Sequence, residues 1–380
     1  MKKVVAVIFH APCGGSPLER LTEAGQRANA VDLVQWLASA KISSVDYVTS
    51  SHVIASQGVP PGVTPVPSGD EARFHFGDYL HQLIRGHRPD GLLYFGSGSG
   101  ALLDNREIDR LVEFAGGAMR GALFNNFYSC DFAAIANPQE LLSISLPPID
   151  NSLGFALADA GFPCYALPRD RGTQCDIDTP IDLLLLHRTG CGGRALLSYL
   201  QTAIPPHPTL DAVLPLLTDR SAVLALVGRI NPTVWSHFES EVACRTNGYV
   251  EGRGMRSAGT PHMPFLAQVL REDGGRAFFR RLARAADGAV IDSRVLLADR
   301  GVLPEKADRF ASDWFQTGDI ADPLWHAFTE EAAAAPLPVL LGGHSLVSGG
   351  LYLLADACWK GSELPRRLHP DPYPWEDAQP

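Results

Sequence analysis

Short apolar runs alternate with amphipathic helical patterns in the first half of this chain, and this alternation constrains its fold most strongly. Strands that alternate with helices pair in parallel and carry helices on the faces of their sheet. We expect strands at 3–9, 45–51, 91–98 and 163–168, helices at 28–40, 77–86 and 104–115, and a loop at 52–70. The predicted fold class is therefore α/β, with a mostly parallel sheet and helices on both of its faces.

The same alternation begins again after a Pro-rich turn at 204–208. Strands are expected at 222–228, 288–298 and 337–343, with a helix at 274–286. This pattern predicts a second α/β domain. The predicted division is a first domain at 1–203, a second domain at 209–360 and a Pro-rich tail at 361–380.

Composition limits the classes of partner. The 380-residue chain has a formal net charge of −10, which argues against a nucleic-acid-binding surface. No stretch reaches the roughly 18–20 apolar residues of a membrane span. Seven scattered cysteines form no Cys-x-x-Cys pair, which is typical of reduced thiols in a cytoplasmic protein. We expect small-molecule ligands, no nucleic acid and no membrane, while the oligomeric state stays open.

Three aspartates, Asp176, Asp178 and Asp182, precede a run of four leucines. Thr179 is predicted to cap a helix that starts at the following proline, with the leucines on its buried side. Asp182 then lies in the first turn, where it suits the helix dipole and has a structural role. Asp176 and Asp178 precede the cap. Alternate residues of an extended segment share a face, so these two carboxylates are expected to point into one cleft.

Open parallel sheets bind ligands at the carboxyl ends of their strands, which directs attention to two glycine-rich loops. One contains Gly14 and Gly15, and the other runs from Gly96 to Gly100. Adjacent glycines let backbone amides approach a phosphate. An ordinary turn is the alternative interpretation of each loop.

These features together resemble the GT-A-type nucleotidyltransferases, a group that includes guanylyltransferases of molybdopterin and 2-phospholactate metabolism and sugar-acid cytidylyltransferases. The first motif is approximated by Gly14, Gly15, Ser16 and Arg20, and the segment 176–183 closely matches the second, D-x-D-T-P-x-D-L. The resemblance covers roughly the first 200 residues. It implies transfer of a nucleotidyl group from a nucleoside triphosphate to a small phosphorylated or hydroxylated acceptor, with release of pyrophosphate.

The resemblance also implies roles for individual residues. The expected ligands are a nucleotide or nucleotide-sugar, a small-molecule acceptor and Mg²⁺. The implied catalytic residues are Arg20, Arg27 and Asp178; the implied nucleotide-binding residues are Cys13, Gly14, Gly15, Ser16, Gly96 and Ser97; and the implied metal ligands are Asp176 and Asp178.

The chain departs from this pattern in ways that keep a second hypothesis open. The family carries an aspartate at the end of a central strand, but here the strand runs into glycines and serines with no carboxylate before Asp104. Metal binding would then rest on Asp178, helped by Asp104 or Asp131. Arg27 takes the place of an expected lysine, and the spacing from the glycines to Arg20 is one residue longer. The second hypothesis is a degenerate protein that binds a nucleotide or nucleotide-sugar without catalysis.

Two further polar regions have open interpretations. The segment 124–132 is favoured as an ordinary loop, with an acceptor pocket as the alternative. The second half carries a candidate site for a phosphate or carboxylate, and activity located there is a further hypothesis. Its residues are Arg229, Arg253, Arg256, Asp292, Arg294, His344 and Ser345. A structural network of ion pairs is the alternative. A serine hydrolase is disfavoured, because the sequence around Ser345 is not a G-x-S-x-G elbow.

Overall fold

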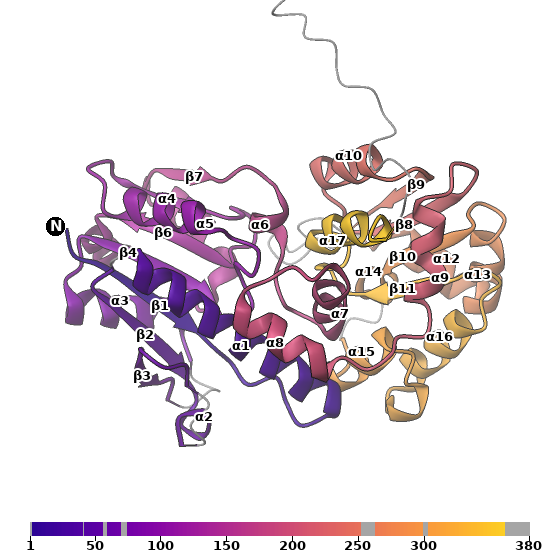
Figure 1. Ribbon diagram of the computed structural model, residues 1–380, viewed down its shortest axis with the longest axis horizontal. Coiled ribbons are helices and arrows are strands. Elements are labelled where there is room, and N and C mark those ends of the chain that lie inside the picture. Colours follow the sequence, from indigo (N-terminus) through magenta and orange to yellow (C-terminus); the bar gives the residue numbers. More distant parts are fainter. Residues whose placement is uncertain are drawn as a thin grey trace, which may run out of the picture.

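The computed structural model describes residues 2–40, 42–55, 59–69, 74–251, 263–298 and 303–361. It contains two β-sheets, one in each half of the chain, with helices packed around and between them (Figure 1). In these ranges no helix has the length and apolar character needed to cross a membrane.

The first sheet has seven strands in the order β3-β2-β1-β4-β6-β5-β7. The strands are β1 (Val4–Phe9), β2 (Ser44–Thr49), β3 (Thr64–Pro67), β4 (Gly91–Gly96), β5 (Gly121–Phe124), β6 (Phe132–Ala136) and β7 (Cys164–Ala166). All neighbouring pairs are parallel except those made by β6, which runs antiparallel to both β4 and β5. The predicted α/β class with a mostly parallel sheet is confirmed.

Helices cover both faces of this sheet. The helices of the first half are α1 (Pro17–Ser39), α2 (Ser51–Ala55), α3 (Phe76–His87), α4 (Asn105–Ala115), α5 (Leu153–Asp159), α6 (Arg171–Gln174), α7 (Pro180–Thr189) and α8 (Arg194–Ala203). Apolar side chains of α1 and α4 pack on one face, and those of α3 and α5 pack on the other. Alternate residues of β1 point to the two faces, as the period of two in a strand requires.

The second sheet has four parallel strands in the order β11-β10-β8-β9. They are β8 (Val223–Gly228), β9 (Arg245–Val250), β10 (Gly288–Asp292) and β11 (Val339–Gly342). The helices of this half are α9 (Leu210–Leu217), α10 (Pro232–Glu241), α12 (Phe265–Asp273), α13 (Gly275–Leu282), α14 (Ser293–Leu296), α15 (Lys306–Asp313), α16 (Pro323–Ala333) and α17 (Gly349–Cys358). Buried side chains of α12, α13 and α16 cover one face, and those of α9, α10 and α17 cover the other.

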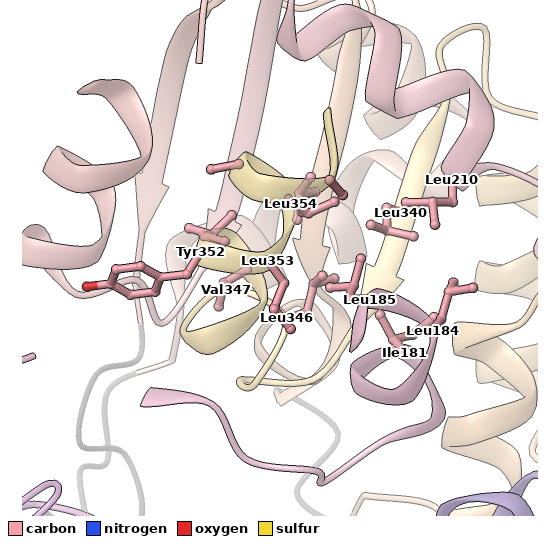
Figure 2. Packing of buried hydrophobic residues seen from close by; sticks show 14 of the residues in the cluster. Ile181, Leu184, Leu185, Leu210, Leu340, Leu346, Val347, Tyr352, Leu353 and Leu354 are labelled. Carbon is pink, nitrogen blue, oxygen red and sulfur yellow. The ribbon is translucent and has the colours of Figure 1, made fainter. Parts of the chain in front are cut away.

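The two halves share one hydrophobic cluster. Leucines of α7 pack with side chains from β8, β10, β11 and α17, and Figure 2 shows Leu184 and Leu185 near Leu340 and Leu346. Figure 1 places α7 and α17 between the two sheets. The four-leucine run is therefore buried, as the sequence predicts, and it is buried largely against the second half of the chain.

Several predicted element boundaries were wrong. The helix expected at 28–40 begins at Pro17, because Ser16 and Glu19 form a capping box that starts it earlier. The loop expected at 52–70 contains α2 and the edge strand β3. The segment expected as a strand at 288–298 leaves the sheet after Asp292 and becomes α14. The tail from 362 onward lies outside the described residues.

Candidate functional site

A small cavity lies between the carboxyl end of the first sheet and the loop that follows β11 in the second. It is lined by polar side chains from both halves of the chain. The lining residues are Asn126, Ser129, Asp131, Thr173, Gln174, Asp176, Asp178, His344, Ser345 and Ser348. Binding sites of parallel sheets lie at the carboxyl ends of their strands, so this is where a ligand site is expected.

The acidic segment before α7 is fixed against the loop that follows β4. Ile177 donates its N–H to the carbonyl oxygen of Gly98 at 3.0 Å, and Asp176 forms an isolated antiparallel bridge with Ser99. Gln26 of α1 donates to the carbonyl oxygen of Ile177 at 2.7 Å. A Cβ at Gly98 would lie 2.7 Å from that same oxygen, so only glycine permits this approach. The glycine-serine loop is thus a close-packed support for the two aspartates.

Asp131 occupies the position for which the sequence offered no carboxylate. Because β6 runs antiparallel to β4, the residue before β6 lies beside the end of β4, and Gly96 donates its N–H to the carbonyl oxygen of Asp131 at 2.9 Å. Asn125 holds the side chain, since its amide donates to Asp131 Oδ2 at 2.8 Å. Asp104 has a different role, because it caps α4 by accepting from Glu107 N–H at 2.8 Å. Of the two candidates, Asp131 is the one that joins Asp176 and Asp178 at the cavity.

The carboxyl groups at the cavity perturb one another. Burial, followed by the charge of Asp178, raises the pKa of Asp131 to about 8. The same two causes, in the same order, hold the pKa of Asp176 well above its usual range. Both side chains keep some exposure through the cavity, but the protein around them excludes bulk water. A divalent cation would offset this repulsion, because it favours the ionised form of each carboxyl group.

The structure places Asp182 where the sequence predicted it, in the first turn of α7. Its Oδ2 atom accepts hydrogen bonds from the N–H groups of Asp178 and Thr179, at 3.0 and 2.7 Å. It also accepts from the hydroxyl of Ser345 at 2.9 Å, across the boundary between the two halves. Burial, followed by the charge of Asp178, nevertheless raises the pKa of Asp182 to about 7, against the effect of these donors.

The first glycine-rich loop leads directly into α1, and two of its amides already have partners. Ser16 donates its N–H to Glu19 at 2.9 Å, and Cys13 donates its N–H to Glu23 at 3.2 Å. Gly14 has φ of 132°, a conformation that favours glycine. Two carboxylates therefore occupy the N–H donors on either side of the two glycines.

The expected arginines lie around this loop in different settings. Arg20 donates to the carbonyl oxygen of Gly15. Arg27 lies near Tyr47 and Tyr199, where its charge lowers the pKa of both phenols against the larger effect of burial.

A lysine from the second half also reaches the loop. Burial raises the pKa of the Cys13 thiol to about 11, and Lys306 is the nearby charge that most opposes this shift. Lys306 begins α15, which packs against α1. No motif in the sequence indicates that a lysine of the second half lies near this loop.

The loop at Gly96 and Ser97 is joined to β1 and α1 by buried polar side chains. His10 Nδ1 lies 2.9 Å from the Ser97 hydroxyl, and Asn29 donates to the carbonyl oxygens of Ser97 and Ser99 at 2.9 and 2.8 Å. Two buried atoms here have no hydrogen-bond partner, Asn29 Oδ1 and the Tyr47 hydroxyl oxygen, while His10 Nε2 lies 3.9 Å from Glu23 Oε1. Buried polar atoms without partners are rare in proteins, so this region has unused capacity for a polar ligand.

The second-half candidates that the structure describes meet at the carboxyl ends of β8, β10 and β11, but their two arginines are paired. Arg229 binds Asp292 through Nε and Nη2, at 2.6 and 3.1 Å. Although burial opposes ionisation, Arg229 holds the pKa of Asp292 below its usual range. Arg294 pairs with Asp313 through both of its terminal nitrogens. Arg253 and Arg256 lie outside the described residues.

His344 and Ser345, from the same predicted set, line the cavity directly. Burial, followed by the positive charge of Arg229, lowers the pKa of His344. A hydrogen bond to the backbone of Arg229 fixes the ring. The second half thus contributes an imidazole and two serine hydroxyls to a cavity whose carboxylates come from the first half.

The donor set of the cavity suits a hard cation. Among the described residues, no group of three or more His, Cys, Asp or Glu side chains is arranged to hold a metal ion. Mg²⁺ is usually held by one or two carboxylates together with phosphate oxygens and water, and it does not require a complete protein cage. Asp176 and Asp178, with Asp131 beside them, meet that smaller requirement.

A larger hollow of about 350 Å³ lies elsewhere, between Thr209 and the segment 332–339. It sits at the amino end of β11, and none of its lining side chains is ionisable. The site at the carboxyl ends is therefore the better candidate for chemistry, although its cavity is smaller.

Comparison with known proteins finds partial likenesses among solved structures. Solved structures that resemble this chain include nucleotidyltransferases, each matching about half of it. A cytidylyltransferase from Leptospira borgpetersenii has 16% identity and a TM-score of 0.38, over 50% of this chain and 87% of that one. A nucleotidyl transferase from Methanothermobacter has 18% identity and a TM-score of 0.36, over 53% and 99%. No protein-family model and no curated protein matches the sequence. At these identities the likeness concerns the fold alone.

Proposed function

We propose that this protein is a nucleotidyltransferase, which binds a nucleoside triphosphate at the carboxyl end of its first sheet and transfers the nucleotidyl group to a small acceptor. The observation that carries this proposal is the meeting of Asp131, Asp176 and Asp178 at one cavity, beside the two glycine-rich loops. The motif resemblance of the loop 13–20 and the segment 176–183 supports it independently.

The residues have three proposed roles: they hold the metal ion, receive the phosphates and contact the base and sugar. Asp176 and Asp178, with Asp131 beside them, would hold Mg²⁺, which would supply positive charge to offset that of the phosphates. The loop at Gly14 and the positive charge of Lys306 would receive the remaining phosphates. Arg20 and Arg27 stay predictions for the same task.

The base and sugar of the nucleotide would lie along the buried polar atoms at the ends of β1 and β2. The unpartnered atoms of Asn29 and Tyr47 would take part in hydrogen bonds there. A ligand that paired with them would remove the cost of leaving buried polar groups unsatisfied.

Pyrophosphate release tests the proposal directly. Purified full-length protein is incubated with each of four nucleoside triphosphates and a panel of phosphorylated and hydroxylated acceptors, with Mg²⁺ or with a chelator. We expect Mg²⁺-dependent pyrophosphate release with at least one combination. If no combination releases pyrophosphate in a Mg²⁺-dependent manner, the protein is not a nucleotidyltransferase for these acceptors.

A second candidate function is nucleotide binding without catalysis. The observation that favours it is the occupation of the loop amides of Cys13 and Ser16 by the carboxylates of Glu23 and Glu19. Calorimetry separates the two functions. Nucleotide binding of equal affinity with Mg²⁺ and with a chelator supports the binding protein, whereas binding that requires Mg²⁺ supports the transferase.

A further inference from the structure

Three serine hydroxyls of the cavity present acceptor oxygens to a ligand, because each already donates its hydrogen bond to another group of the protein. Ser129 donates to Asn151 at 2.6 Å, Ser345 to Asp182 at 2.9 Å and Ser348 to the carbonyl oxygen of Gln174 at 3.4 Å. A hydroxyl group has one proton and two lone pairs, so each of these oxygens retains accepting capacity. A ligand hydroxyl, which both donates and accepts, can pair with these oxygens and with the side-chain amides of Asn126 and Gln174 in the same lining.

The charges at the cavity also disfavour a phosphorylated acceptor. Three aspartates line it, and no arginine or lysine is among its described lining residues. The two nearby arginines of the second half, Arg229 and Arg294, are each paired with a buried aspartate. A phosphate group only accepts hydrogen bonds at neutral pH and carries negative charge. Beyond the Mg²⁺ that the carboxyl groups would hold for the nucleotide, the described lining offers a second phosphate group no arginine or lysine with which to pair.

The size of the cavity limits what enters it. Its volume is about 50 Å³. A water molecule needs about 10–15 Å³ of such a cavity, so there is room for only a few heavy atoms, such as a hydroxymethyl group and its neighbours. The remainder of a larger ligand would lie outside, on the rim.

An exposed aromatic side chain belongs to the loop that forms one wall. Tyr128 lies between the lining residues Asn126 and Ser129, and its side chain is 56% exposed. Its ring contacts those of Phe127 and Phe155, with centroids 5.4 and 6.0 Å apart. Exposed aromatic groups beside a polar cavity are typical of ligand sites, because a ring combines an apolar face with a polar edge.

We propose that the cavity receives the hydroxyl-bearing end of an uncharged sugar or polyol, and that this molecule, not a phosphorylated compound, is the nucleotidyl acceptor. This inference rests on the proposed function for its reaction step. The acceptor oxygen forms a bond to the α-phosphorus, and the bond from that phosphorus to the pyrophosphate oxygen breaks. The electron pair leaves with pyrophosphate, and the hydroxyl proton passes to solvent.

Matched acceptor pairs test the inference. Glucose, ribitol and glycerol are each compared with a monophosphate of the same compound, first by pyrophosphate release and then by ligand-observed NMR binding to the full-length protein. We expect the uncharged member of at least one pair to have a kcat/KM about tenfold or more above its phosphate, a difference of about 1.4 kcal/mol. A preference for the phosphorylated members overturns the inference.

A serine variant locates the binding. Ser348→Ala removes one lining hydroxyl, and we expect it to raise the KM of the uncharged acceptor while the KM of the nucleotide is unchanged. Ser240→Ala is the matched control, because Ser240 lies exposed on α10, where its hydroxyl donates only to the carbonyl oxygen of His237. Equal acceptor KM values in the two variants would contradict the assignment of the cavity.

The NMR binding measurements distinguish failure of the transferase proposal from failure of the proposed ligand class. If no acceptor supports pyrophosphate release, but uncharged members bind and Ser348→Ala weakens that binding, the transferase proposal fails and the ligand class stands. If neither member of any pair binds, the inference is wrong whatever the activity of the protein.

Discussion

At the scale of single residues, Asp131 shows how a side chain can reach the carboxyl end of a parallel sheet although it precedes its own strand. The antiparallel direction of β6 sets the start of that strand beside the end of β4. Nothing in the sequence of the loop 124–132 reveals this direction, because strand direction depends on pairing with residues far along the chain. From the sequence, Asp131 could therefore be proposed only as one of two possible partners of Asp178 in metal binding.

The raised pKa of Asp131 predicts a pH dependence of stability. Its folded value of about 8 lies above the unfolded value of about 3.9, so the folded state binds more protons between these limits. The stabilisation is complete below about pH 4 and is lost as the pH rises through about 8. When a chelator keeps metal ions from the site, the ionisation of Asp131 should therefore lower the Tm of the wild type between acid and neutral pH. Asp131→Asn should reduce this fall in thermal unfolding followed by circular dichroism, and equal slopes would contradict the prediction.

Asp178→Asn tests the proposed metal ligand. We expect kcat/KM for Mg²⁺-dependent pyrophosphate release to fall about 100-fold, which corresponds to about 2.7 kcal/mol in the transition state. The reason is the loss of a charged oxygen ligand at the cavity. Asp104→Asn is the matched control, because Asp104 caps α4 and asparagine caps a helix about as well as aspartate. Similar losses of activity in both variants would show that the effect is not specific to the cavity.

At the scale of elements, the first turn of α17 is held against the segment that carries the aspartates. A Cβ at Gly349 would collide with the carbonyl oxygen of Gln174 and lie 2.6 Å from the Cα of Cys175. We expect Gly349→Ala to lower the free energy of unfolding by about 1–3 kcal/mol in urea denaturation, because the backbone on both sides must move. Gly86→Ala, at an open position of α3, should instead be neutral or stabilising by up to about 1 kcal/mol. Equal effects would contradict this account of α17.

Elements with strong local signals were predictable from the sequence, and those defined by distant partners were not. The apolar run of β1 and the Thr179 cap of α7 are local, and both predictions are confirmed. β3 contains Pro65 and Pro67, which argue against a strand; it forms because it lies at the sheet edge, where proline is tolerated. The early start of α1 had a local signal, the pairing of Ser16 with Glu19, which the glycine-rich loop before it obscured.

At the scale of the whole molecule, the division predicted between 203 and 209 lies in the connection between α8 and α9, but the packing does not divide there. Apolar side chains of α7 share one cluster with both β11 and α17. The cavity is likewise formed by both halves, since its carboxylates come from the first half and His344 comes from the second. Burial of the α7 leucines and completion of the cavity therefore both depend on contact between the halves.

Leu185→Ala tests whether the halves unfold together. Leu185 is fully buried in the shared cluster, so its truncation should cost about 2–5 kcal/mol of unfolding free energy. Hydrogen exchange should show loss of protection in both β1 and β10, because one cooperative unit contains both sheets. Leu324→Ala is the matched control, since Leu324 is 45% exposed and its truncation should leave protection unchanged. Loss of protection confined to β10 would show instead that the second half unfolds independently and that the shared cluster does not couple the two sheets.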